Sequence, residues 1–151
     1  MATIAEENTE AKAPLSLTYN LTGIETYGGG STEGWLHFEI KLLRGNETII
    51  ENEGTIHDID ARAIEDICLN VSRKRKQHQP LEPDFTISTE KFSEDEARLT
   101  CFVDVGNSQN KIYSGSELGV SIPTTIYALK NFGENLKAER IALTDNKKWA
   151  H

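Results

Sequence analysis

The sequence predicts an α+β fold: a mostly antiparallel sheet of about six strands with two helices packed on one face. Apolar and polar residues alternate over several segments, the pattern of half-buried strands. The hydrophobic period changes to that of a helix at Asp60 and again at Thr124. The order is therefore βββα-βββα. Equal numbers of residues separate Phe38 from Asp60 and Phe102 from Thr124, so the two halves are candidates for a structural repeat.

Composition places the domain boundaries within this chain of 151 residues, which is the size of one ordinary domain. Residues 1–13 are mostly small and polar, and they predict a disordered acidic tail. The alternating pattern begins at Pro14. We therefore expect a single α+β domain over residues 14–140 and a frayed C-terminal tail over residues 141–151.

The first half is expected to contain three strands and a helix. Residues 15–21 alternate in polarity, and residues 35–42 do so most clearly. Arg44–Glu47 has the composition of a tight hairpin turn, after which a weaker strand covers residues 48–56. An apolar stripe then predicts a helix over residues 60–78.

Charged residues and a proline indicate where this first helix begins and ends. Asp58 or Asp60 is the expected N-cap, because acids suit the positive end of a helix. The basic run Arg73–Lys76 suits the negative end, and Pro80 stops the helix. A patch that binds nucleic acid is the alternative for that run, and the acidic balance of the chain disfavours it.

The second half repeats the pattern, with strands expected at residues 85–89 and 98–105, shorter ones to residue 122, and a helix over residues 124–138. A proline fits the first turn of that helix. The expected core comprises Leu36, Phe38, Ile40, Ile64, Ile67, Leu99, Val103, Leu129 and Phe132.

Charge restricts the class of partner. The chain has 16 basic and 24 acidic residues, a net charge of −8, whereas nucleic acids and anionic membranes attract basic surfaces. We therefore expect neither as a partner and allow a basic one. No apolar run is long enough to span a membrane, and residues 1–14 lack the apolar core of a signal peptide, which predicts a cytoplasmic protein.

The two cysteines, Cys68 and Cys101, lie in different predicted elements and form no CxxC or Cys/His cluster. We expect two buried thiols in a reducing compartment, with no metal and no cofactor. The glycine-rich segment 27–31 joins two strands and lacks the pattern of a phosphate-binding loop, so it predicts a mobile connection.

Acidic residues are densest around the start of the first helix: Asp58 and Asp60, followed by Glu65 and Asp66, with His57 beside them. Helix capping explains such acids. A divalent cation is the alternative, although the spacing matches no known calcium loop. An acidic surface for a basic partner is the third interpretation.

A second candidate lies on the strand at residues 35–42, where Trp35, His37 and Glu39 share a face. By alternation, Phe102 is expected on the same face. A solvated sheet face, a protein-binding face and acid–base chemistry by His37 are the three interpretations. The motifs GxSxG and HExxH are both absent, and we predict no catalytic residue.

One resemblance spans residues 35–137. It rests on Pro80-Leu81-Glu82-Pro83-Asp84-Phe85-Thr86-Ile87, the return strand Leu99–Val105, Ser114-Gly115, and a helix carrying Leu129, Phe132 and Leu136. This arrangement resembles the WapI-type immunity proteins of bacterial polymorphic-toxin systems. The resemblance implies a protein without enzymatic activity that binds its toxin, often a nuclease, and blocks it.

The sequence therefore predicts a non-enzymatic immunity protein that neutralises a basic, nuclease-like toxin domain. A small-molecule-binding or regulatory domain of unknown ligand is the alternative. Charge steering would favour contact through an acidic surface. The predicted partner-binding residues are Trp35, His37, Asp58, Asp60, Glu65 and Asp66.

Overall fold

The computed structural model describes residues 2–6, 13–25, 34–82, 84–106 and 116–144. Over these residues it confirms an α+β fold in which the helices α1 and α3 accompany antiparallel sheets, and the described strands number eight in place of six. The elements are β1 (Ala2–Ala5), β2 (Leu15–Ile24), β3 (Trp35–Arg44), β4 (Glu47–His57), α1 (Asp58–Leu69), β5 (Lys76–His78), β6 (Phe85–Lys91), β7 (Glu96–Asp104), β8 (Glu117–Thr125) and α3 (Ile126–Thr144).

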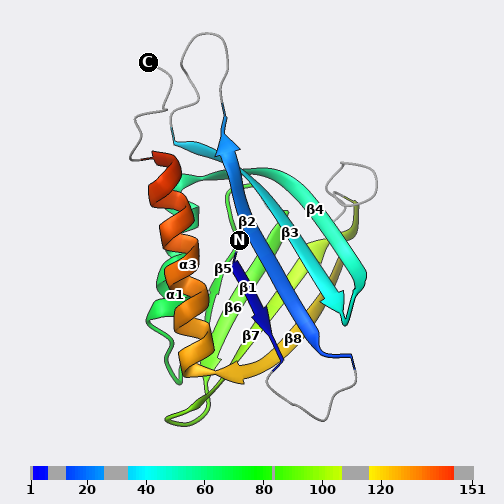
Figure 1. Ribbon diagram of the computed structural model, residues 1–151, viewed down its shortest axis with the longest axis vertical. Helices are drawn as coiled ribbons and strands as arrows, with labels where there is room; N and C mark the ends of the chain where they lie inside the picture. The colour runs from blue at the N-terminus through cyan, green and yellow to red at the C-terminus, as the bar shows by residue number, and fades with distance from the viewer. Residues whose placement is uncertain (1, 7–12, 26–33, 83, 107–115, 145–151) are drawn as a thin grey trace.

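Each half forms its own four-stranded antiparallel sheet. The N-terminal sheet has the order β1-β2-β3-β4 and the C-terminal sheet the order β5-β6-β7-β8, so each is a meander followed by a helix. The two sheets lie one behind the other with crossing strands, and the two helices lie side by side along one side of them (Figure 1). The order of elements therefore repeats as ββββα.

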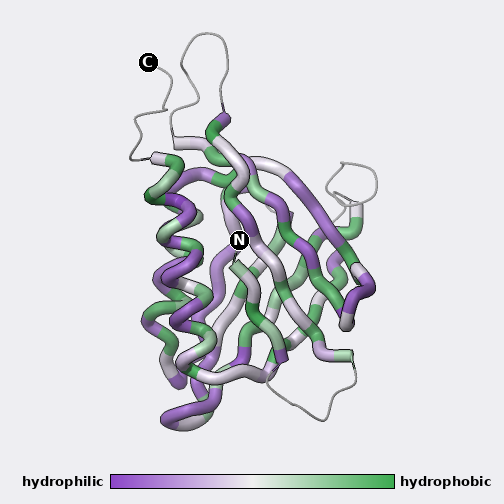
Figure 2. The backbone as a smooth tube through the Cα atoms, viewed as in Figure 1, coloured by the Kyte–Doolittle hydropathy of each residue, from purple (hydrophilic) through white to green (hydrophobic). Residues whose placement is uncertain are grey.

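Apolar and polar residues alternate along the strands (Figure 2). The apolar residues of each sheet are buried on the face that it turns to the core. The buried faces of the two sheets meet in an aromatic cluster. The centroid of the Phe38 ring lies 6.1 Å from that of Tyr19 in the same sheet and 5.1 Å from that of Phe85 in the C-terminal sheet. Such ring pairs add specific geometry to hydrophobic burial. All nine residues predicted for the core are buried.

The N-terminus corrects one expectation. Ala2–Ala5 is not a disordered tail but the edge strand β1, which pairs antiparallel with β2. Ala2 and Ile4 are buried, and alternate with exposed residues. A strand this short leaves little composition signal, and its burial depends on a neighbour distant in sequence. Residues 7–12 and 145–151 of the predicted tails, and the whole of the loop at 27–31, lie outside the described residues.

Helix α1 ends earlier than predicted, at Leu69, with Asn70 as its C-cap. Of the basic run Arg73–Lys76, the first three residues therefore lie in the connection to β5 and Lys76 begins that strand, so the run is not a helix end. The prediction was wrong because a run of Lys and Arg fits either a helix or an exposed strand, and the sheet decides between them. Helix α3 begins two residues later than predicted and extends to Thr144.

The β3–β4 hairpin turn was predicted correctly at Arg44–Glu47. Gly45 has a φ of 58°, in the left-handed region that favours glycine. Among the described residues, neither helix combines the length and the apolar character that crossing a bilayer requires.

Candidate functional site

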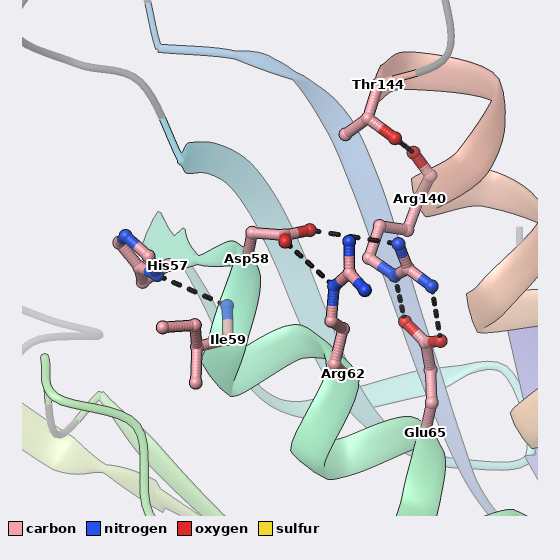
Figure 3. Close-up of polar contacts among 7 residues, drawn as sticks. All are labelled: His57, Asp58, Ile59, Arg62, Glu65, Arg140 and Thr144. Atoms are coloured by element: carbon pink, nitrogen blue, oxygen red, sulfur yellow. Dashed lines mark hydrogen bonds and ion pairs between the residues drawn. The ribbon is translucent and has the colours of Figure 1, made fainter.

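The acids predicted as a partner surface are bonded within the molecule, beginning at the start of α1. The N-cap is His57, not an aspartate: its Nδ1 accepts a hydrogen bond from the Ile59 N–H at 3.2 Å (Figure 3). Asp58 pairs with Arg62 one turn on, at 2.8 Å. Asp58 also lies 3.8 Å from the Arg140 guanidinium of α3.

Glu65 is a buried structural residue, and only 5% of its surface is exposed. Arg140 donates to both of its carboxylate oxygens, at 2.6 and 3.0 Å (Figure 3). This bidentate pair joins α1 to α3, and hence the first half of the chain to the second. Glu65 therefore has no surface to offer a partner.

Asp60 and Asp66 are also bonded internally. Asp60 contacts His78 Nε2 of β5 at 2.9 Å and accepts from the Leu81 N–H at 3.0 Å. Asp66 accepts from the Asn70 side-chain amide at 2.7 Å. Asp60 thus holds α1 against β5, whereas Asp66, within the described part of the chain, bonds only to the C-cap of its own helix and is exposed.

Trp35 and His37 lie at the start of β3 but have separate contacts. The Trp35 ring packs edge-to-face on His57, with centroids 5.2 Å apart. His37 projects from the outer face of the N-terminal sheet, where its Nε2 lies 3.0 Å from Glu25. Phe102 is on the other sheet, so the predicted single surface of Trp35, His37 and Phe102 does not exist.

Burial makes the two cysteines unsuitable for chemistry. Cys68 and Cys101 have no exposed surface, and burial raises the pKa of both thiols well above its usual value. Among the described residues, no three His, Cys, Asp or Glu side chains lie together in the way a metal ion requires.

The outer face of the N-terminal sheet, which we name the acidic face, carries Glu39, Lys41, Glu51 and Glu53. Glu39 and Glu53 lie directly opposite each other in the ladder, an arrangement that is destabilising for like charges. Lys41 reaches Glu51 at 3.5 Å. Carboxylates therefore dominate this face.

The outer face of the C-terminal sheet is different in chemistry, and we name it the arginine face. Its residues lie on strands β6, β7 and β8 or, in one case, just before β5, and together they line one cavity of about 230 Å³. They are Arg75, Ser88, Glu90, Arg98, Thr100, Phe102 and Ser121.

Cations and hydroxyl groups are neighbours on the arginine face. Arg75 and Arg98 are both exposed, and Arg75 Nε donates to Ser88 Oγ at 3.2 Å. Thr100 Oγ1 and Ser121 Oγ lie 3.3 Å apart across the β7–β8 pair. Ser88 is itself buried, so the accessible donors are the two guanidinium groups and the Thr100–Ser121 hydroxyl pair, which can donate to phosphate and sugar oxygens.

Phe102 gives the same face an aromatic surface. It lies opposite Gly119 of β8, and a Cβ atom on Gly119 would collide with the Phe102 ring. The glycine therefore lets the ring lie against the sheet. A second ring, Phe92, is 43% exposed beyond the β6–β7 pairing and lies under the Arg98 guanidinium, 5.0 Å from centroid to Cζ.

Sequence reasoning missed this face for two reasons. Arg75 was assigned to a helix end, and Phe102 was assigned to the same surface as His37. The available signal was the alternation of Arg98, Thr100 and Phe102 along one strand. Only the successive pairing of β5, β6, β7 and β8 in one sheet brings Arg75 and Ser121 to the same side.

Comparison with known proteins gives structural matches only. No family model and no curated protein sequence matches the chain. The fold is similar to Trypanosoma brucei MRP1/MRP2, with a TM-score of 0.51 and 6% identity over 97% of this chain and 86% of that one.

Two plant structures match at similar coverage. The transcriptional regulator PBF-2 has 13% identity over 96% of this chain and 90% of that one, with a TM-score of 0.49. Arabidopsis thaliana WHY1 has 13% identity over 93% of this chain and 82% of that one, with a TM-score of 0.48.

These matches correct the function predicted from sequence. The fold is shared with MRP1/MRP2, which is not an immunity protein, so the prediction of toxin neutralisation is wrong. The exclusion of nucleic acid in favour of a protein partner is wrong as well. It rested on the net charge of −8, a sum that does not report how charge is divided between faces.

Proposed function

We propose that this chain binds single-stranded nucleic acid on the arginine face. The observation that carries the proposal is the placement of Phe102, Arg98 and Arg75 around one cavity on an outer sheet face. Proteins that bind single strands combine cations for the phosphates with aromatic rings on which bases stack. A ring that lies on a sheet can stack only on a base that has left its own stack, which favours a single strand over a duplex.

The remaining groups divide the binding between backbone and bases. The exposed guanidinium groups of Arg75 and Arg98 suit phosphate oxygens, and the hydroxyl pair of Thr100 and Ser121 suits sugars and base edges. The acidic face repels phosphates, so a strand is confined to one side of the molecule. This division explains how a chain of net charge −8 attracts a polyanion.

Fluorescence anisotropy with a labelled oligothymidine tests the proposal, with the matching duplex as the competitor. Phe102→Leu keeps an apolar side chain over Gly119 but removes the aromatic ring, so it should weaken binding by about 1–3 kcal/mol, the contribution of one stacked base. Phe102→Tyr keeps the ring and should bind like the unmodified chain. Equal affinity of Phe102→Leu and the unmodified chain, or no binding at low salt, contradicts the proposal.

A further inference from the structure

Glu90 is a carboxylate on the arginine face whose position calls for an explanation. It lies directly opposite Arg98 in the β6–β7 ladder, where opposite charges usually pair. The Arg98 guanidinium instead lies over the Phe92 ring. Among the described residues, the Glu90 side chain has no hydrogen bond or ion pair, and Glu90 is half-buried at the wall of the cavity.

A carboxylate at this place opposes phosphate binding, because like charges repel. Its two oxygens only accept hydrogen bonds, so the ligand group that meets them must be a donor. In a single strand the donors that a protein can reach are those on the edges of the bases and, in RNA, the ribose 2′-hydroxyl, which offers one hydrogen where a base edge can offer two. The cavity of about 230 Å³, with the Phe102 ring among its lining groups, is of a size to take one base.

We propose that this cavity binds guanine, with Glu90 accepting from the Watson–Crick edge and Arg75 or Arg98 donating to O6 and N7. The inference rests on the proposed function, in that the guanine belongs to a bound single strand. Guanine presents N1–H and the N2 amine side by side, which matches the two oxygens of a carboxylate. Arginine donating to O6 and N7 is the commonest specific contact to guanine.

The other bases fit this set of groups less well. Adenine and cytosine place one amine next to a ring nitrogen whose lone pair faces the carboxylate. Thymine and uracil place one N–H between two carbonyl oxygens. Only guanine offers two adjacent donors to the Glu90 carboxylate and two adjacent acceptors to an arginine. Only guanine therefore forms bidentate hydrogen bonds with both kinds of charged group that line the cavity.

Replacing one central thymidine of the labelled oligothymidine tests the proposal by anisotropy. Guanosine should increase affinity at least about tenfold, the effect of one good bidentate pair, and adenosine or cytidine should not. Inosine lacks the N2 amine and tests Glu90; 7-deazaguanosine lacks the N7 acceptor and tests the arginine. Each should lose most of the gain.

Glu90→Gln provides the matching variant and Glu53→Gln on the acidic face its control. Glu90→Gln should abolish the preference for guanosine while oligothymidine still binds as tightly or more tightly, because a negative charge is removed. Glu53→Gln should retain the preference. A preference that survives Glu90→Gln, or no preference in the unmodified chain, overturns the guanine pocket and leaves the proposed function standing if oligothymidine binds.

Guanosine monophosphate distinguishes a base within a strand from a free nucleotide. If no oligonucleotide binds but guanosine monophosphate does, and Glu90→Gln abolishes that binding, the guanine pocket is supported and the proposed function fails. If neither an oligonucleotide nor the nucleotide binds, both proposals fail.

Discussion

The acidic face and the arginine face are outer surfaces of two sheets with the same topology, and they differ in chemistry. Both sheets are antiparallel meanders of four strands followed by a helix. On one, Glu39 and Glu53 oppose each other in the ladder; on the other, Arg98, Thr100 and Phe102 occupy alternate positions along β7. The fold repeats because inner faces must be apolar, whereas outer faces are free to diverge.

The comparison also shows why the net charge misled. A charge of −8 describes the whole chain, but a ligand that approaches one face senses the nearby charges most, since screening limits their range to about 8 Å at physiological salt. The three predictions below test how far the two faces are independent, in order of decreasing effect.

The largest effect, on the free energy of unfolding, is expected at the Glu65–Arg140 pair that joins the helices of the two halves. Glu65→Ala leaves the buried Arg140 guanidinium without its bidentate partner, and breaking a buried pair in this way should lower the free energy of unfolding by about 3–5 kcal/mol. Urea denaturation followed by circular dichroism measures it. Asp66→Ala, next along α1 and exposed, is the control and should cost well under half as much. A loss below about 1 kcal/mol for Glu65→Ala would show that the helices do not depend on this pair.

The next largest effect, on the affinity for oligothymidine, is expected when one charge is reversed on each face. Arg98→Glu and Lys41→Glu change the net charge equally, and both positions are exposed. Arg98→Glu should weaken oligothymidine binding at least about tenfold, because it removes a phosphate contact and adds repulsion, whereas Lys41→Glu should change it less than about twofold. Equal losses in the two variants, measured by anisotropy, would mean that net charge and not the arginine face controls binding.

The smallest effect is on salt dependence. The slope of log affinity against log salt falls by about 0.7 for each phosphate contact that a single strand loses. Replacing both Arg75 and Arg98 by alanine should therefore reduce the slope by roughly 1.4, and Lys41→Ala should leave it unchanged. Titrations at several salt concentrations give the slope, and an unaltered slope in the double variant would place the phosphates elsewhere.

The sequence by itself determined most of the fold. Alternation along β2, β3 and β7 marks their buried faces, and the helical stripe through Ile64 and Ile67 marks α1, because local periodicity reports which side of an element is apolar. The hairpin at Gly45 also carried its own signal. The edge strand β1 did not, since four residues are too few to establish a period.

Only the tertiary structure decided which surfaces these elements form. The alternation with a period of two predicts that His37 and Phe102 both lie on an outer face. It does not show that the two residues belong to different sheets. Nor does it show that Glu65 meets Arg140, 75 residues away in the chain, and so becomes a structural residue. The candidate site arises the same way: Arg75, Glu90 and Phe102 meet through strand pairing, which depends on contacts between segments that no local pattern encodes.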